Sequence, residues 1–133
     1  MEHLVKLYIQ EEKPSKATQV LKKLIELDSS YNEMKNEIID QHLEDIKKNP
    51  SDFKLRFHLG IIYKELEMWK QAIEQFQQTR KSSDYVLESH SMLGICFAQQ
   101  PPMRSLAIKT LEKGLQLPGF KPKDYIELHY QLA

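Results

Sequence analysis

Residues 53–86, FKLRFHLGIIYKELEMWKQAIEQFQQTRKSSDYV, carry a pattern that recurs further along the chain. A fixed shift of this size indicates stacked supersecondary units. We therefore expect a second copy of the same helical unit, with one residue added between its two helices. Five positions return after 34 or 35 residues with the same or a similar side chain, namely Leu59/Leu93, Gly60/Gly94, Tyr63/Phe97, Ala72/Ala107 and Phe76/Leu111.

The small residues of this unit predict a close contact between two antiparallel helices. Gly60 and Ala72 allow the two backbones to approach, and Tyr63 and Phe76 fill the wedge beside that contact. At these positions the sequence resembles the tetratricopeptide repeat family. The resemblance implies an all-α fold, an α-solenoid of antiparallel helix pairs wound into a right-handed superhelix. The unit departs from the family pattern at three positions, Arg56, Thr79 and Asp84, where a large apolar residue, Ala and Pro are usual.

A second alignment extends the repeat toward the N-terminus. Tyr8, Ala17 and Leu21 precede Tyr63, Ala72 and Phe76 by 55 residues each, which leaves room for one additional helix between the units. We expect a single domain over 1–133, made of a partial repeat (1–29), an unpaired linking helix (30–50), two repeats (53–86 and 87–120) and the first helix of a truncated repeat (122–133). Pro14 suits a first helical position, Asp52 suits an N-cap, and Ser82-Ser83-Asp84 predicts a loop and cap.

The linking helix is predicted from the apolar spacing in 31–48. Tyr31, Met34, Ile38, Leu43 and Ile46 recur at helical intervals, with Ile39 widening the stripe and charges on the other side. Asn49-Pro50 ends the helix. It packs between the flanking helix pairs or folds across a groove, and its charged side is interpreted as a solvated face.

The chain both starts and stops inside a repeat, which indicates a fragment of a longer array. Tyr125, Leu128 and Tyr130 have no following helix to cover them. We expect this open C-terminal end to promote homodimerisation.

Composition excludes several classes of protein. Lys+Arg and Asp+Glu both total 19, so there is no basic stripe for a nucleic acid partner. No run of 18 apolar residues predicts a membrane span. The first residues lack the features of a signal peptide, so the cytoplasm is the default location.

Nothing in the sequence predicts an enzyme. His3, His42, His58, His90 and His129 form no metal-ligand spacing, and the scattered glycines make no phosphate loop. The single Cys96 is interpreted as a buried thiol. We therefore expect no catalytic residues, no metal and no cofactor.

The resemblance implies a binding surface on the concave side, which the first helices of the repeats would line. Its role would be that of a protein–protein interaction scaffold that holds a peptide or helix of a partner. The alternative is a structural or self-assembly segment of a longer solenoid with no groove ligand. The groove is open, or it is filled by helix 31–48. Phe57 and Ile61 exclude the carboxylate-gripping subtype of the family. The implied surface residues are Lys54, Phe57, Ile61, Lys64, Glu65, Glu88, Ser91, Ile95, Ala98, Gln99, Glu127 and Tyr130.

Overall fold

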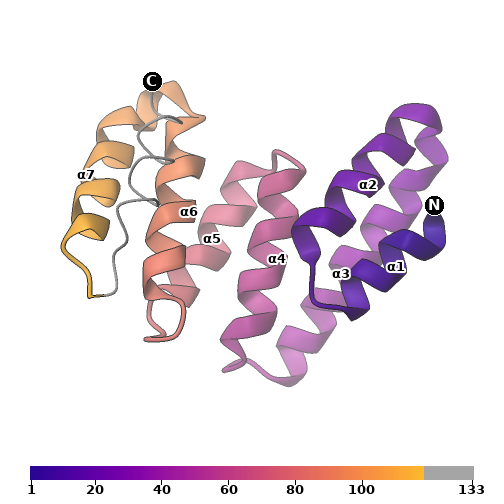
Figure 1. The fold of residues 1–133 in the computed structure, drawn as a ribbon, viewed down its shortest axis with the longest axis horizontal. Helices are drawn as coiled ribbons and strands as arrows, with labels where there is room; N and C mark the ends of the chain where they lie inside the picture. Colours follow the sequence, from indigo (N-terminus) through magenta and orange to yellow (C-terminus); the bar gives the residue numbers. More distant parts are fainter. Residues whose placement is uncertain (119–133) are drawn as a thin grey trace. The chain divides into compact units, whose positions relative to one another are not determined.

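A computed structural model describes residues 1–118, which form seven α-helices and no strand (Figure 1). The all-α prediction is confirmed, and the helices lie close to the predicted ranges. They are α1 (Glu2–Gln10), α2 (Pro14–Leu27), α3 (Asn32–Lys48), α4 (Phe53–Glu65), α5 (Trp69–Thr79), α6 (Val86–Ala98) and α7 (Arg104–Leu115), with short 3-10 turns at Ser29–Tyr31 and Pro101–Met103. The helix predicted for 122–133 lies outside the described residues.

The chain divides into two compact units, and the boundary falls between Met68 and Trp69. The first unit holds α1 to α4, and the second begins with α5. The boundary therefore lies inside the stretch predicted as the 53–86 repeat.

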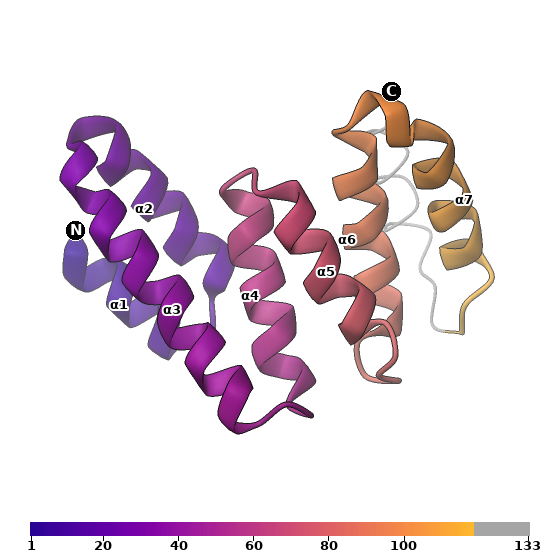
Figure 2. The ribbon, with the colours of Figure 1, turned by 180° about the vertical axis from the view of Figure 1, so that it is seen from behind.

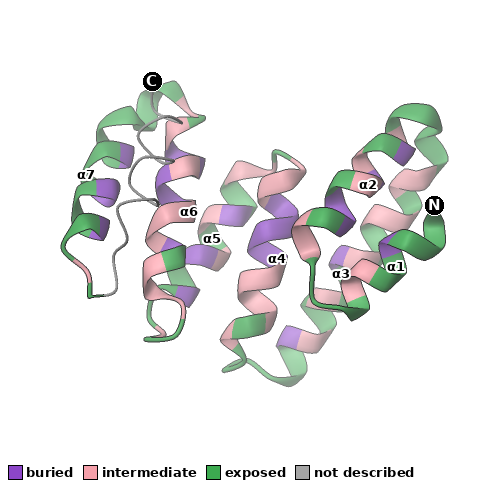
Figure 3. Ribbon diagram, viewed as in Figure 1, coloured by how far each residue is buried: buried purple, intermediate pink, exposed green. Residues whose placement is uncertain are grey.

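In the first unit, α1 and α2 form a hairpin around a small apolar core (Figure 3). Val5 of α1 is fully buried against Ala17, Leu21 and Leu24 of α2. Pro14 opens α2 at its first turn, as predicted, where its missing N–H leaves no hydrogen bond unmade. The apolar residues of α1 and α2 recur at helical spacing, and this explains why the two helices pack against each other.

The same turn ends α1 and α4. Glu12 and Glu67, 55 residues apart, both have left-handed backbone angles (φ 60° and 62°). Lys13 N–H donates to the carbonyl of Tyr8, and Met68 N–H donates to the carbonyl of Tyr63, each at 2.8 Å. These are the bonds of a Schellman-type helix end. The backbone therefore repeats at the interval that the sequence alignment predicted.

Helix α3 packs on α4 and on the α1–α2 core (Figure 2). Ile39 and Ile46 are buried, and Met34 and Ile38 pack against the core of the hairpin. Leu43 is 41% exposed, so its predicted place in the buried stripe is wrong. Leu43 follows Ile39 by four residues, so it lies beside it at the edge of the buried face. Met34, Ile38 and Ile46 lie on the other side of Ile39 around the helix.

Helix α4 is enclosed around its middle. Its residues 59–63 are all buried, and it packs on both α2 and α3. The Asp52 carboxylate caps the helix by accepting the N–H of Leu55 at 3.2 Å, as predicted.

In the second unit, α6 packs on both α5 and α7. The repeat positions on these three helices are all buried, namely Ala72, Phe76, Leu93, Gly94, Phe97, Ala107 and Leu111. Thr79, which departs from the family pattern, is fully buried, and its hydroxyl lies 2.6 Å from that of buried Ser89 on α6. The unusual polar residue therefore has a buried partner.

The two ends of α6 differ from what the sequence or the first unit would predict. The predicted cap at Ser82-Ser83-Asp84 is wrong, because Tyr85 is the N-cap of α6 and makes no side-chain cap bond. The turn after α6 is a 3-10 turn at Pro101–Met103 rather than a left-handed one. Pro101 aligns with Glu67, and a proline ring cannot adopt a positive φ.

Candidate functional site

The predicted surface residues of α4 contact the chain itself at one end of the helix. Lys54 forms an ion pair with Glu12, which lies in the turn between α1 and α2. The hydrogen bond from Lys54 lowers the pKa of the Glu12 carboxyl below its usual range. The turn between α1 and α2 is thereby held against the start of α4.

A second set of polar contacts lies at the other end of α4. The Glu65 carboxylate accepts a hydrogen bond from the Ser15 hydroxyl at 3.1 Å and pairs with Lys64 Nζ at 3.2 Å. The side chains of both members of the ion pair are less than a fifth exposed. Ser15 belongs to the first turn of α2, so the same hairpin reaches both ends of α4.

Between these ends the apolar residues of the surface are largely covered. Ile61 is 9% exposed, and Phe57 is half-buried. Ile61 is thus covered and Lys54 and Glu65 have partners within the unit, whereas Lys54 stays exposed and Phe57 is buried only in part. The contacts from outside α4 come from Glu12 in the α1–α2 turn and from Ser15 in the first turn of α2, which the sequence did not suggest as partners of this surface.

The corresponding face of α6 is more accessible. Glu88 and Gln99 at its two ends are exposed, and Ser91, Ile95 and Ala98 between them are half-buried. The Ser91 hydroxyl donates to the Leu87 carbonyl at 3.2 Å within the helix. The buried residues of α6 lie on its other faces, so these five residues form a face with an apolar centre and polar ends.

Glu127 and Tyr130, the remaining predicted surface residues, lie outside the described residues. The twelve predicted positions are therefore not equivalent. Those on α4 are engaged within the first unit, and those on α6 remain partly accessible in the second.

His58 on α4 is a feature that sequence reasoning missed. Burial lowers the pKa of its imidazole, and positively charged Lys54 and the nearby His42 of α3 act in the same direction. Glu12 and Asp52 oppose them by favouring the charged form. The His42 ring makes a 2.8 Å hydrogen bond to the Ile38 carbonyl within α3. His42 of α3 is thus close enough to His58 of α4 to influence its charge.

The part of the chain that the structure describes contains no group of three His, Cys, Asp or Glu side chains placed to hold a metal ion. Cys96 is buried, as predicted. Within residues 1–118, no helix combines the length and the apolar character needed to cross a membrane. Comparisons of the chain with protein-family models, curated proteins and solved structures found no match.

Proposed function

We propose that this protein is a protein–protein interaction module that binds a peptide or helix of a partner on the first-helix face of its second unit. The binding surface is the α6 face formed by Glu88, Ser91, Ile95, Ala98 and Gln99. The resemblance of the repeated sequence positions to the tetratricopeptide repeat family and the all-α structure support this proposal.

The observation that carries this proposal is the partial exposure of Ile95 and Ala98 between two exposed polar residues. A strip with an apolar centre and a polar rim is the usual composition of a surface that receives a partner segment. The apolar centre supplies the affinity of such a contact, and the rim residues Glu88 and Gln99 orient the bound segment.

The equivalent face of α4 is a weaker candidate. Lys54, Lys64 and Glu65 have partners in their own unit, and Ile61 is 9% exposed. A ligand on this face would compete with the ion pair of Lys54 to Glu12 and with the hydrogen bond from Ser15 to Glu65. We therefore propose the α6 face, and not the α4 face, as the site of the partner.

Affinity capture with matched variants tests the proposal. The wild-type chain, Ile95→Glu and Ile108→Glu are immobilised and exposed to a lysate of the source cell, and bound proteins are quantified by mass spectrometry. Ile108 is an exposed isoleucine of α7 in the same unit, so its variant controls for the added charge. We expect a partner that the wild type and Ile108→Glu retain and that Ile95→Glu loses by about tenfold or more. Identical captured sets for all three chains would contradict the proposal.

A further inference from the structure

The first unit carries two complementary surfaces on its other helices. We propose that the basic face of α2 docks on the acidic face of α3 in a second copy of this chain. This goes beyond the proposed function, because it uses neither α6 nor a foreign partner.

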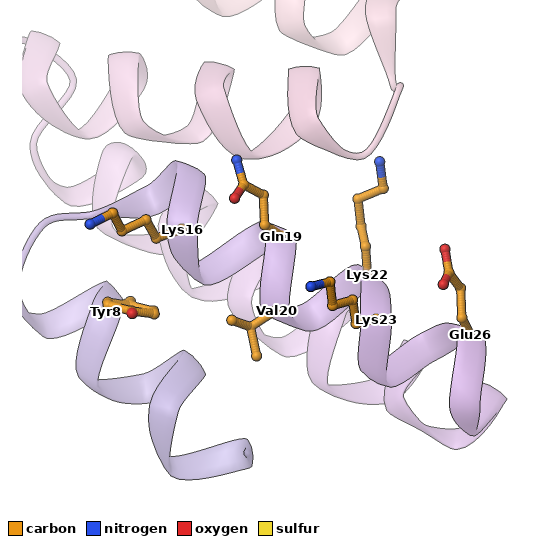
Figure 4. A pocket seen from close by; sticks show the side chains of 7 residues that line it. All are labelled: Tyr8, Lys16, Gln19, Val20, Lys22, Lys23 and Glu26. Atoms are coloured by element: carbon orange, nitrogen blue, oxygen red, sulfur yellow. The ribbon is translucent and has the colours of Figure 1, made fainter.

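The basic face surrounds a shallow depression of about 550 Å³ between α1 and α2 (Figure 4). Tyr8 and Val20 give it an apolar part, and neither residue is fully buried. Lys16, Lys22 and Lys23 also line the depression, with Glu26 as the single acid, so the lining has a charge of +2. The Lys22 side chain points away from Tyr8 and Val20 (Figure 4). No ion pair within residues 1–118 involves these lysines, which are Lys16, Lys22 and Lys23.

The acidic face lies on the outward side of α3. Four carboxylates at intervals of four, three and four residues are all exposed, namely Glu33, Glu37, Asp40 and Glu44. This spacing places them on one face of the helix, opposite the buried Ile39 and Ile46. None of the four has an ion-pair partner among the described residues.

The two faces match in register. Lys16 and Lys23 lie seven residues apart on α2, which is about 10.5 Å along a helix. Glu33 and Asp40, or Glu37 and Glu44, have the same separation on α3. Two helices laid side by side can therefore bring two lysines opposite two carboxylates at once.

An apolar contact can accompany the charged ones. Leu43 of α3 is 41% exposed and follows Asp40 by three residues, at the edge of the acidic face. Tyr8 and Val20 offer an apolar surface among the lysines. Leu43, which the fold does not bury, thus has a complementary site on the other copy.

A second copy suits these faces better than a nucleic acid does. Phosphate binding would use the lysines of α2 but would leave the α3 carboxylates and Leu43 without a role. The whole chain carries 19 basic and 19 acidic residues, and a net charge near zero favours self-association. The contact joins different patches of the two copies, so it either repeats by a two-fold axis or extends head to tail.

Sedimentation velocity of the full chain over a concentration series tests this inference. At about 50 mM NaCl we expect reversible association, and at about 500 mM NaCl the dissociation constant should rise about tenfold or more, because screening weakens exposed charge pairs. An α2 variant (Lys16→Gln, Lys22→Gln, Lys23→Gln) and an α3 variant (Glu33→Gln, Glu37→Gln, Asp40→Asn, Glu44→Gln) should each lose association at low salt.

Mixing the two variants is the decisive step. Each retains the face that the other lacks, so an equimolar mixture should form a heterodimer although each variant alone stays monomeric. The matched control Lys70→Gln, Lys81→Gln, Lys109→Gln changes three exposed lysines of the second unit and should associate like the wild type. Wild type that stays monomeric at low salt, association that survives either variant, or a mixture that stays monomeric would overturn the inference.

Discussion

Gly94 of α6 lies directly against Leu111 of α7. A Cβ atom added at Gly94 would stand 2.7 Å from Leu111 Cγ, closer than side-chain carbons approach one another. Gly94 is the second-unit counterpart of Gly60, but its close neighbour is Leu111 and not Ala107, the counterpart of Ala72. Gly94 is therefore required by packing, whereas in an unconstrained helix it would only lower stability.

Gly94→Ala should destabilise the chain by about 1–2 kcal/mol. Overpacking typically costs about 1–3 kcal/mol, and the higher helix propensity of Ala offsets part of that cost. Urea denaturation followed by circular dichroism measures the change. A variant more stable than the wild type would show that Leu111 moves aside freely.

Gly114→Ala is the matched substitution and should have the opposite sign. Gly114 is a buried position of α7, but an added Cβ would meet only His90 Cβ at 3.8 Å, an ordinary contact. Replacement in a helix should then stabilise by about 0.5–1 kcal/mol. The same denaturation assay checks it, and a loss of stability would refute the packing described for this site.

The buried hydroxyl pair of Thr79 and Ser89 should behave as a coupled unit. Ser89→Ala removes one partner and should cost about 1 kcal/mol, because a fully buried hydroxyl loses a hydrogen bond. Thr79 retains its 3.2 Å bond to the Phe76 carbonyl, which limits the loss. In a double-mutant cycle with Thr79→Ala, we expect a coupling of about 0.5–1.5 kcal/mol. Additive effects would mean that the two hydroxyls act independently.

His58 should make the first unit less stable in mild acid. Its pKa in the folded chain lies below the usual value of 6.5, because burial disfavours the charged ring. The unfolded chain then binds the proton more readily, so the contribution to stability is full above pH 6.5, falls as the pH drops from 6.5 toward the lower pKa of the folded chain, and levels off below it. His58→Gln should flatten this fall without changing the steeper loss in stronger acid. Thermal melts of the wild type and of His58→Gln between about pH 7.5 and 5 measure this fall in stability. If the melting temperatures of both chains fall in parallel, His58 is not the cause of the fall.

The sequence predicted the helices well because their determinants are local. Apolar spacing set the faces of α2 and α4, and Pro14 and Asp52 marked two helix starts. The repeated Leu, Gly, Ala and aromatic positions were identified as packing residues, and in the second unit they are buried. Leu43 follows the buried Ile39 by four residues, and it is exposed because it lies at the edge of the buried face, where helical spacing alone does not decide whether a side chain is covered.

Whether the predicted binding surface is exposed or covered could not be predicted from the local sequence pattern. Ser15 and Glu65 are 50 residues apart, and Glu12 meets Lys54 only because the α1–α2 turn lies against α4. Helical spacing places Ile61 on a face but does not say which segment covers that face. Helical spacing predicted the α6 face in the same way, and on α6 the central residues Ser91, Ile95 and Ala98 remain accessible in part.

The availability of the α6 face is the central claim, and the free energies of unfolding of Ile61→Glu and Ile95→Glu test it most directly. Ile61 is 9% exposed, so an introduced carboxylate should cost about 3 kcal/mol or more, as expected for an unpaired charge at a buried site. Ile95 is buried only in part at the centre of the α6 face, and its variant should lose no more than about 1 kcal/mol. Comparable losses for the two variants would contradict the account, because Ile95 would then be part of the core and unable to receive a partner.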